Sequence, residues 1–213
     1  MKIDSNLYVD YLKSAYQLIH ENEKYVTDLD LATGDGDHWS NLNKGFAALV
    51  AMEDELRSMP LDQMFMKIGM TMMATIGGSS GVLYGGAYMA ASKTLKGKDH
   101  MEAADLQLVL AAMLEDIQNR GKAERGFKTM IDALAPAVDA FKEGLDQGLS
   151  DHELLAQIKE ASLEGAEATK AMEAVRGRAT YQADKGVGHL DPGAVTMSYQ
   201  ISTLCDTIAK TIE

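Results

Sequence analysis

The spacing of apolar residues constrains the fold more than any other feature, because they recur every three or four positions through most of the 213 residues. That spacing places them along one face of a helix. Aromatic residues make up only 6% of the chain, and valine and isoleucine are sparse, whereas Ala, Leu, Met, Glu and Lys are abundant. This composition favours helix over strand. We therefore predict an all-α protein, and one domain over residues 1–213, because no composition break marks a second.

Capping and breaking residues divide this pattern into helices. We expect a first helix from Ser5, as its N-cap, to about Asn22, followed by a short acidic connection. A second should run from Leu42 through Leu56 and stop at Pro60. The remaining helices are expected to follow Pro60, Gly81, Asp99, Gly126, Ser150 and Asp191.

The ends of these later helices carry recognisable signals. Residues 77–81, Gly-Gly-Ser-Ser-Gly, should form a loop, and Gly121 should be the residue that follows the fifth helix. Ser150 and Glu153 form a capping box, and Asp191-Pro192 is typical of an N-cap and first helical position. An antiparallel bundle places alternate junctions at the same end, so the loops rich in Gly, Asp, Ser and His should share one rim.

The first of these loops contains Gly34-Asp35-Gly36-Asp37-His38, with Asp30 before it and Asn41 after it. Glycine before each aspartate lets the backbone turn both carboxylates toward one point. Magnesium prefers oxygen ligands and is commonly held by one or two carboxylates together with substrate phosphates. The helix that follows offers an N-terminus to such phosphates. The spacing therefore predicts a metal-nucleotide loop, although Asp-Gly clusters also occur in ordinary turns.

Other cation and nucleotide motifs do not fit. Counted from Asp35, the fifth, sixth and twelfth positions are Trp39, Ser40 and Phe46, where an EF-hand needs Asp or Asn, Gly and Glu. The chain has no G-x-x-x-x-G-K-[ST] sequence and no G-x-G-x-x-G turn after Gly34 or Gly186. A nucleotide would be held without a P-loop or a Rossmann turn.

The net charge of −12 argues against nucleic acid or an anionic membrane surface as a partner, because both require a basic face. Phosphate binding must then be achieved locally, by a metal, a helix terminus or a placed arginine. The single cysteine, Cys205, excludes an internal disulfide, and no signal-like or spanning apolar segment occurs. A cytoplasmic protein is expected.

Five spaced motifs together resemble a known family. They are residues 34–38 with Asn41, 77–85, 128–132, 177–179 and 188–194. In order and over nearly the whole chain, these motifs look like the nucleotide-binding L subunit of dihydroxyacetone kinase. The resemblance implies a closed barrel of eight antiparallel helices with ADP and two magnesium ions at one rim. In phosphotransferase-dependent versions the ADP stays bound, is rephosphorylated by a phosphohistidine protein, and passes its γ-phosphoryl to a sugar on a separate K subunit.

The resemblance also implies roles for individual residues. The metal ligands fall on Asp30, Asp35 and Asp37, the same three carboxylates that the spacing had indicated. The implied phosphate contacts are His38, Asn41, Ser79 and Ser80, and the implied adenosine contacts are Gly121, Met130, Arg178, Asp191, Pro192 and Gly193. Whether the chain forms a homodimer is left open.

The chain departs from the family pattern at several positions. Trp39 stands where glycine is usual, Val82 where proline is usual, and Phe127 where an acidic residue is common. Residues 182–185, Gln-Ala-Asp-Lys, replace a familiar Leu-Gly-Glu-Arg. A paralogue acting on another short sugar therefore stays open. Because Trp39 lies between His38 and Ser40, we expect its fluorescence to respond when Mg-ADP binds.

Two other functions remain to be weighed. Gly77-x-Ser79-x-Gly81 also fits the nucleophile elbow of serine hydrolases, with His189 as a base, but the elbow needs a strand before the serine. The pattern before Ser79 is helical instead. The other is a nucleotide-binding coactivator that binds a transcription regulator, which only phosphoryl turnover with partners would separate from a kinase subunit.

Overall fold

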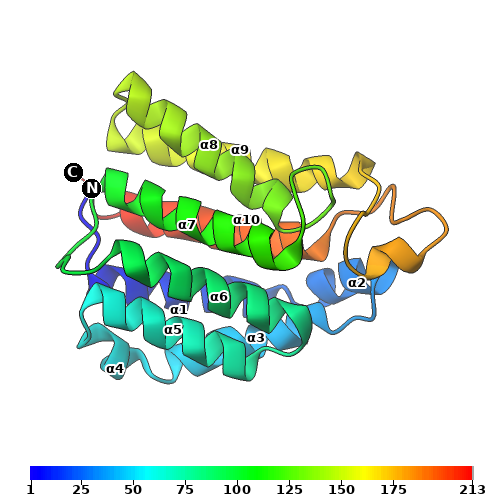
Figure 1. Cartoon of the computed structure of the whole chain (residues 1–213), viewed down its shortest axis with the longest axis horizontal. Helices are drawn as coiled ribbons and strands as arrows, with labels where there is room; N and C mark the ends of the chain where they lie inside the picture. Colours follow the sequence, from blue (N-terminus) through cyan, green and yellow to red (C-terminus); the bar gives the residue numbers. More distant parts are fainter. Residues whose placement is uncertain (213) are drawn as a thin grey trace.

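A computed structural model describes residues 1–212, and within that range the chain forms ten α-helices and no strand (Figure 1). The only extended pairing among these residues is an isolated bridge between Ile3 and Met101. The helices are α1 Ser5–Glu21, α2 Glu23–Thr33, α3 His38–Val50, α4 Glu53–Arg57, α5 Leu61–Thr75, α6 Gly78–Thr94, α7 Ala103–Gly121, α8 Ile131–Gln147, α9 Asp151–Ala168 and α10 Pro192–Ala209. Two 3-10 turns, η1 Thr169–Ala171 and η2 Arg178–Tyr181, precede α10.

The all-α prediction is confirmed, but the helix count differs from the eight expected. Eight helices are 13 to 19 residues long, and α2 and α4, with 11 and 5 residues, are additional. The long helices contact one another in the order α1, α3, α5, α6, α7, α8, α9, α10, and α10 in turn contacts α1. They therefore pack as a ring, with buried side chains filling its interior.

The apolar pattern did not predict α2 and α4, and the structure shows why. Segment 23–33 buries only Val26, Asp30 and Thr33, so it shows little helical periodicity although it is helical. The expected helix through Leu56 is interrupted at Met52, whose φ of −113° and ψ of 25° are not helical. Beyond this break, the Arg57 guanidinium donates to Asp10 of α1 at 2.6 Å, which ties α4 to its neighbour.

Three expected helix ends are shifted. The N-cap of α1 is Asp4, which accepts from the Leu7 N–H at 2.9 Å, whereas the Ser5 hydroxyl donates to the Met59 carbonyl. Gly121 lies inside α7, and Lys122 takes the left-handed conformation after it, with φ of 49°. The loop at 77–81 is shorter than expected, because α6 already begins at Gly78.

Other caps are where the sequence placed them. The Ser150 hydroxyl accepts from the Glu153 N–H, and the Glu153 carboxylate accepts from the Ser150 N–H at 3.0 Å. Asp191 accepts from the Ala194 N–H at 2.7 Å with Pro192 at the first helical position of α10. These caps fix where α9 and α10 begin. Among the described residues, no helix combines the length and apolar character that crossing a membrane would need.

Close packing of α8 against α9 depends on Gly165. A Cβ atom there would collide with the Asp132 carbonyl of α8 and lie 3.0 Å from the Pro136 ring. Alanine has a helix propensity about 1 kcal/mol better than glycine, so propensity alone would make Gly165→Ala stabilising. Overpacking costs about 1–3 kcal/mol, and here the obstructing atom is backbone, which cannot rotate away.

We therefore expect Gly165→Ala to lower the free energy of unfolding by about 1–2 kcal/mol in urea titrations. Glu164→Ala is the matched control, because Glu164 is exposed on the same helix and should change stability by less than about 0.5 kcal/mol. An unchanged or raised stability of Gly165→Ala would show that α8 and α9 are not packed this closely.

Candidate nucleotide and metal site

The Gly-rich junctions meet at one end of the helix ring, on the right of Figure 1, as the alternating loop pattern predicted. A cavity of about 490 Å³ lies there between the starts of α6 and α10, the end of α7 and the loop before α8. Its lining residues are His38, Ser79, Ser80, Val82, Leu83, Ile117, Arg120, Gly121, Ala123, Lys128, Thr129, Met130, Ile131, Arg176, Gly177, Asp191, Pro192 and Gly193. Segments more than 150 positions apart in the sequence thus form one concave surface.

Most of the residues that the sequence singled out lie on this wall. The lining includes His38, Ser79, Ser80, Gly121, Met130, Asp191, Pro192 and Gly193. Asn41 does not line the cavity and instead faces Gly77, where an added Cβ would lie 3.0 Å from the amide oxygen of Asn41. Arg178 also lies off the wall, and Arg176 and Gly177 take its place there.

Asp30, Asp35 and Asp37 converge beside the cavity, with one carboxylate oxygen of each within 4.8 Å of the others. Asp30 is buried in the last turn of α2, whereas Asp35 and Asp37 are exposed on the following loop. Gly36 allows the loop to turn, because its φ of +78° is unfavourable for other residues. Gly34 has a φ of −148° and is needed for space, since a Cβ there would collide with the Asp30 carboxylate.

Hydrogen bonds and charge partners orient two of these carboxylates. The His38 N–H donates to Asp30 Oδ2 at 2.9 Å, and the Arg178 guanidinium lies 2.6 Å from Asp35 Oδ2. Three carboxylates so close repel one another unless a cation lies among them. The all-oxygen ligand set and its exposure on one side fit Mg²⁺, which keeps several waters or phosphate oxygens.

His38 connects the carboxylates to the cavity. Its Nε2 lies 2.8 Å from the Thr196 hydroxyl of α10, which fixes the ring against that helix. Burial lowers the pKa of His38, while Asp30 and Asp37 act in the opposite direction. The net lowering favours a neutral imidazole at pH 7, able to form hydrogen bonds without adding a full charge.

The start of α6 is the best anion-binding feature of the wall. Its N-cap residue is Gly77, which has no side chain to accept a hydrogen bond from the first turn. Ser79 and Ser80 lie in that turn and line the cavity, so their N–H groups are directed toward the helix N-terminus, where a phosphate is stabilised. At α10, by contrast, the Asp191 carboxylate already accepts from the first turn.

Lys128 is a structural member of the site that the sequence analysis did not single out. Its side chain is 2% exposed, and its φ of +61° lies in the left-handed region. The ammonium donates to the carbonyls of Thr169 and His189. Burial lowers the pKa of Lys128, whereas Asp191, Asp132 and Asp184 oppose that effect. Lysine with positive φ has no sequence signature, so only its place in the 128–132 motif pointed toward it.

Two arginines on the wall were also missed. Arg120 contacts Asp116 one turn earlier on α7 at 2.5 Å, and this pair lies over Gly86 of α6, where an added Cβ would push it aside. Arg176 donates to the Lys122 carbonyl at 2.8 Å. Both guanidinium groups add positive charge to the cavity of an acidic protein. Arginines beside glycine are usually surface charges, so the sequence alone could not have selected them.

Trp39 is next to His38 in the sequence, but its side chain points away from the cavity. Its indole N–H donates to the Ile19 carbonyl of α1 at 2.9 Å, and the ring packs against the core. Trp39 is absent from the cavity wall among the described residues. Helical geometry explains the difference, because consecutive residues of α3 point in different directions. A fluorescence response to a nucleotide would therefore be indirect.

The structure also decides against the serine hydrolase alternative. A nucleophile elbow needs a strand before the serine, but Ser79 follows helix α5 and lies in the first turn of α6. The His189 side chain is exposed, while its carbonyl accepts from Lys128. No strand occurs in residues 1–212 that could support such an elbow.

Comparison with known proteins shows which family the chain resembles. The family model described as "DAK2 domain" matches residues 32–206. The "PEP-dependent dihydroxyacetone kinase 1, ADP-binding subunit DhaL" of Listeria innocua is 35% identical, over 97% of this chain and 98% of that protein. The "PTS-dependent dihydroxyacetone kinase, ADP-binding subunit DhaL" of Lactococcus lactis is also 35% identical, over 94% and 96%.

A solved structure shares the fold. The dihydroxyacetone kinase from C. freundii in complex with AMP-PNP and Mg²⁺ aligns with a TM-score of 0.71 and 25% identity over 96% of this chain. This chain spans only 33% of that longer protein. The alignment therefore covers one part of a larger kinase, and nearly the full length of the two bacterial subunits.

Burial raises the pKa of Asp191 to about 7, with the Ala194 N–H and Lys128 opposing the rise. The ordinary value is near 3.9, so between about pH 4 and 7 the folded protein binds more protons than the unfolded chain. Stability therefore falls as pH rises through this window. Asn caps helices as well as Asp, so Asp191→Asn should remove this loss and keep the cap.

The free energy of unfolding of the unsubstituted chain should fall between pH 5 and pH 8 because of Asp191, and that of Asp191→Asn should not. The difference between the two proteins should therefore change by roughly 2–3 kcal/mol in favour of Asp191→Asn over this range. Urea unfolding at both pH values, without nucleotide or metal, measures this difference. Asp28→Asn is the control, because it removes an exposed carboxylate paired with Lys24. Its free energy of unfolding should change with pH almost as that of the unsubstituted chain does. If the stability of Asp191→Asn changed with pH as much as that of the unsubstituted chain, the raised pKa of Asp191 would be contradicted.

Proposed function

The chain belongs to the DAK2 domain family, and from that membership we propose that it is the ADP-binding subunit of a phosphoenolpyruvate-dependent dihydroxyacetone kinase. The observation that carries this proposal is the convergence of Asp30, Asp35 and Asp37 beside a cavity of about 490 Å³. That volume is within the usual range of about 300–1,000 Å³ for small-molecule sites. The cavity also joins an apolar wall to a helix N-terminus, which suits the two ends of a nucleotide.

The adenine would lie against the apolar part of the wall, formed mainly by Leu83, Ile117 and Met130. Phosphates would then reach the N–H groups of Ser79 and Ser80. This orientation brings the terminal phosphate toward the aspartates and the open side of the rim. Phosphoryl transfer depends chiefly on such positioning and on neutralising charge, so no covalent residue is required in this subunit.

Asp30, Asp35 and Asp37 would hold the magnesium, and two ions shared among three carboxylates and the phosphates fit this arrangement. Bound magnesium supplies neutralisation of the charge on the β- and γ-phosphates. The chain's own contribution is geometric. The His38 N–H orients Asp30, and Gly36 turns the exposed carboxylates toward it.

The sugar and the phosphoryl donor would come from partners, a K subunit and a phosphohistidine protein. A phosphoryl group would leave the donor imidazole for ADP, and the resulting γ-phosphoryl would pass to a sugar hydroxyl. A small polyol needs many placed hydrogen bonds or a covalent handle. The histidines outside the rim do not supply one, since His20 bonds Asn43, His100 lies 3.9 Å from Glu102, and His152 is exposed.

Purified chain with Mg-ATP and dihydroxyacetone should therefore form no dihydroxyacetone phosphate in a coupled assay. Adding a K subunit and a phosphohistidine donor from a relative's system should produce turnover that depends on all three proteins. Sustained turnover by the isolated chain would refute the subunit assignment. Failure of the full mixture with several K subunits would favour a paralogue or a coactivator.

Asp35→Asn should weaken Mg-ADP binding at least about tenfold in calorimetry, because losing a metal ligand costs no less than losing a group that orients one. Asparagine nearly retains the shape of the aspartate side chain, so the loss of affinity measures the lost charge and metal coordination. Asp28→Asn on α2 removes the same charge outside the three-aspartate group and should leave the affinity within about twofold. Equal affinities of the two variants would remove Asp35 from the ligand set.

Arg178 should compete with the metal, because its guanidinium contacts Asp35 at 2.6 Å. The pair is exposed, so it is worth about 0.2–1 kcal/mol. Arg178→Ala should therefore bind Mn²⁺ alone up to about fivefold more tightly, as measured by paramagnetic resonance without nucleotide. Arg176→Ala is the matched control, since Arg176 bonds the Lys122 carbonyl instead. Weaker Mn²⁺ binding by Arg178→Ala would contradict competition.

A further inference from the structure

A row of methionines runs along the outer face of α5, away from the nucleotide cavity. Met66, Met70 and Met73 occupy positions i, i+4 and i+7, and they are 37%, 58% and 37% exposed. The opposite face of α5 is already buried in the core. Single exposed apolar residues are ordinary, but a row at helical spacing is a contiguous patch of the kind that marks an interaction site.

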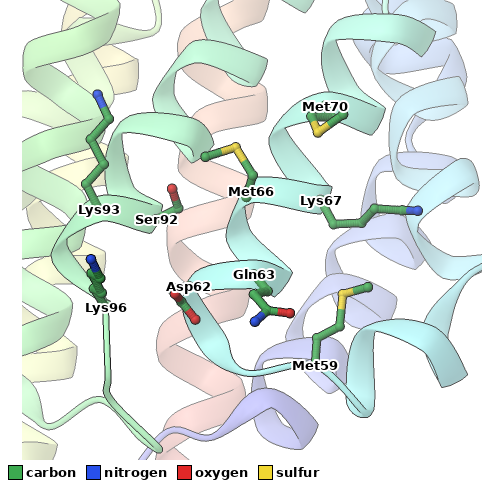
Figure 2. Close-up of a pocket in the computed structure, with 9 residues that line it drawn as sticks. All are labelled: Met59, Asp62, Gln63, Met66, Lys67, Met70, Ser92, Lys93 and Lys96. Atoms are coloured by element: carbon green, nitrogen blue, oxygen red, sulfur yellow. The ribbon is translucent and has the colours of Figure 1, made fainter.

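Met66 and Met70 of this row line a groove of about 440 Å³ between α5 and α6. Its lining is formed by Met59, Asp62, Gln63, Met66, Lys67, Met70, Ser92, Lys93 and Lys96 (Figure 2). The two helices lie close together at Gly69, where an added Cβ would lie 2.7 Å from the Gly85 carbonyl. The groove lies on the side of that contact nearer the start of α5 and the end of α6.

The charges around the groove are unusual for a chain with a net charge of −12. Lys93 and Lys96 are exposed on the α6 side of the groove, and Ser92 lies between Lys93 and Met66 (Figure 2). Within residues 1–212, no ion pair involves either ammonium group, whereas Lys67 points to the other side of α5 and pairs with Glu55 at 2.9 Å. Asp62 is the single acidic residue of the lining.

We propose that this groove binds an acidic amphipathic helix of a partner protein. An apolar face at spacing i, i+3 or i+4, and i+7 would pack on Met59, Met66 and Met70, and acidic residues on one flank would meet Lys93 and Lys96. Helices commonly dock in such grooves, and methionine adapts to different apolar surfaces. The α5 side of the groove, from Asp62 to Met70, spans about 12 Å along the helix, so a partner segment of about 14 residues would cover it with close to one extra turn at each end.

Charge argues against two other occupants. A second copy docked by a two-fold axis would bring Lys93 and Lys96 near their own equivalents. A head-to-tail copy could present the exposed Leu163 and Glu164 of α9, but such contacts build rings or open chains. An anionic membrane is disfavoured because the net charge of −12 is repelled by its surface.

The groove is separate from the nucleotide cavity. It lies beside the end of α6 at Ser92, Lys93 and Lys96, whereas Ser79 and Ser80 are at the start of the same helix. A helix bound in the groove would leave the rim accessible. The inference therefore does not depend on the proposed kinase function.

The test uses the full chain with ¹³C-methyl methionine and two synthetic 14-residue helical peptides. Both carry leucine at the spacing described, one with glutamate and the other with lysine on the flank. The glutamate peptide should shift the Met66 and Met70 methyl signals with a Kd of roughly 10–100 μM. Binding should weaken several-fold between 50 and 300 mM salt, since screening reduces the attraction between exposed charges.

The variant Lys93→Glu with Lys96→Glu should lose the glutamate peptide and bind the lysine peptide instead. Lys142→Glu with Lys210→Glu gives the same change in net charge elsewhere and should behave like the unsubstituted chain. The proposal would be overturned if the methyl signals did not shift, or if both peptides bound equally well. It would also be overturned if the variant kept its preference for the glutamate peptide. Sedimentation showing self-association that Met70→Glu abolishes, or binding to phosphatidylglycerol vesicles that the same substitution removes, would overturn it as well.

Discussion

The buried ammonium group of Lys128 holds the nucleotide end of the molecule together. It joins the loop before α8 to the carbonyls of Thr169 and His189, which belong to the turn after α9 and the loop before α10. Asp132 reinforces this corner by accepting from the N–H groups of Gly126 and Thr129. That corner, together with the packing of Met130 against Gly193, places the wall formed by residues 128–131 relative to α10.

A second constraint is the balance of charge at the rim. Asp30, Asp35 and Asp37 are placed together in a chain that is already strongly acidic, so the site favours cations. The exposed Arg178 supplies part of the compensation at Asp35, and the start of α6 supplies oriented N–H groups. An anionic phosphate can bind here only with such local help, which explains why metal and nucleotide are expected to bind together.

Much of the fold and of the site could be predicted from the sequence. Apolar periodicity identified the long helices, and the Ser150 and Asp191 caps were located correctly because their chemistry is local. The Asp-Gly spacing identified the three carboxylates that the structure brings within 4.8 Å. Such features depend on neighbouring residues, which a sequence shows directly.

The missed features depend on tertiary contacts. Helix α2 buries too few apolar residues to show a pattern, and α4 is fixed by Arg57 reaching Asp10 of another helix. The positive φ of Lys128 and the direction of Trp39 toward Ile19 follow from packing that no short motif encodes.

The most direct test of the account is to denature the purified protein and analyse the released small molecules by chromatography and mass spectrometry. The account predicts close to one equivalent of ADP or ATP per chain, together with magnesium, and a clear loss of both in Asp35→Asn. A protein that carries no adenine nucleotide as purified, and that binds none when Mg-ADP is added, would contradict it.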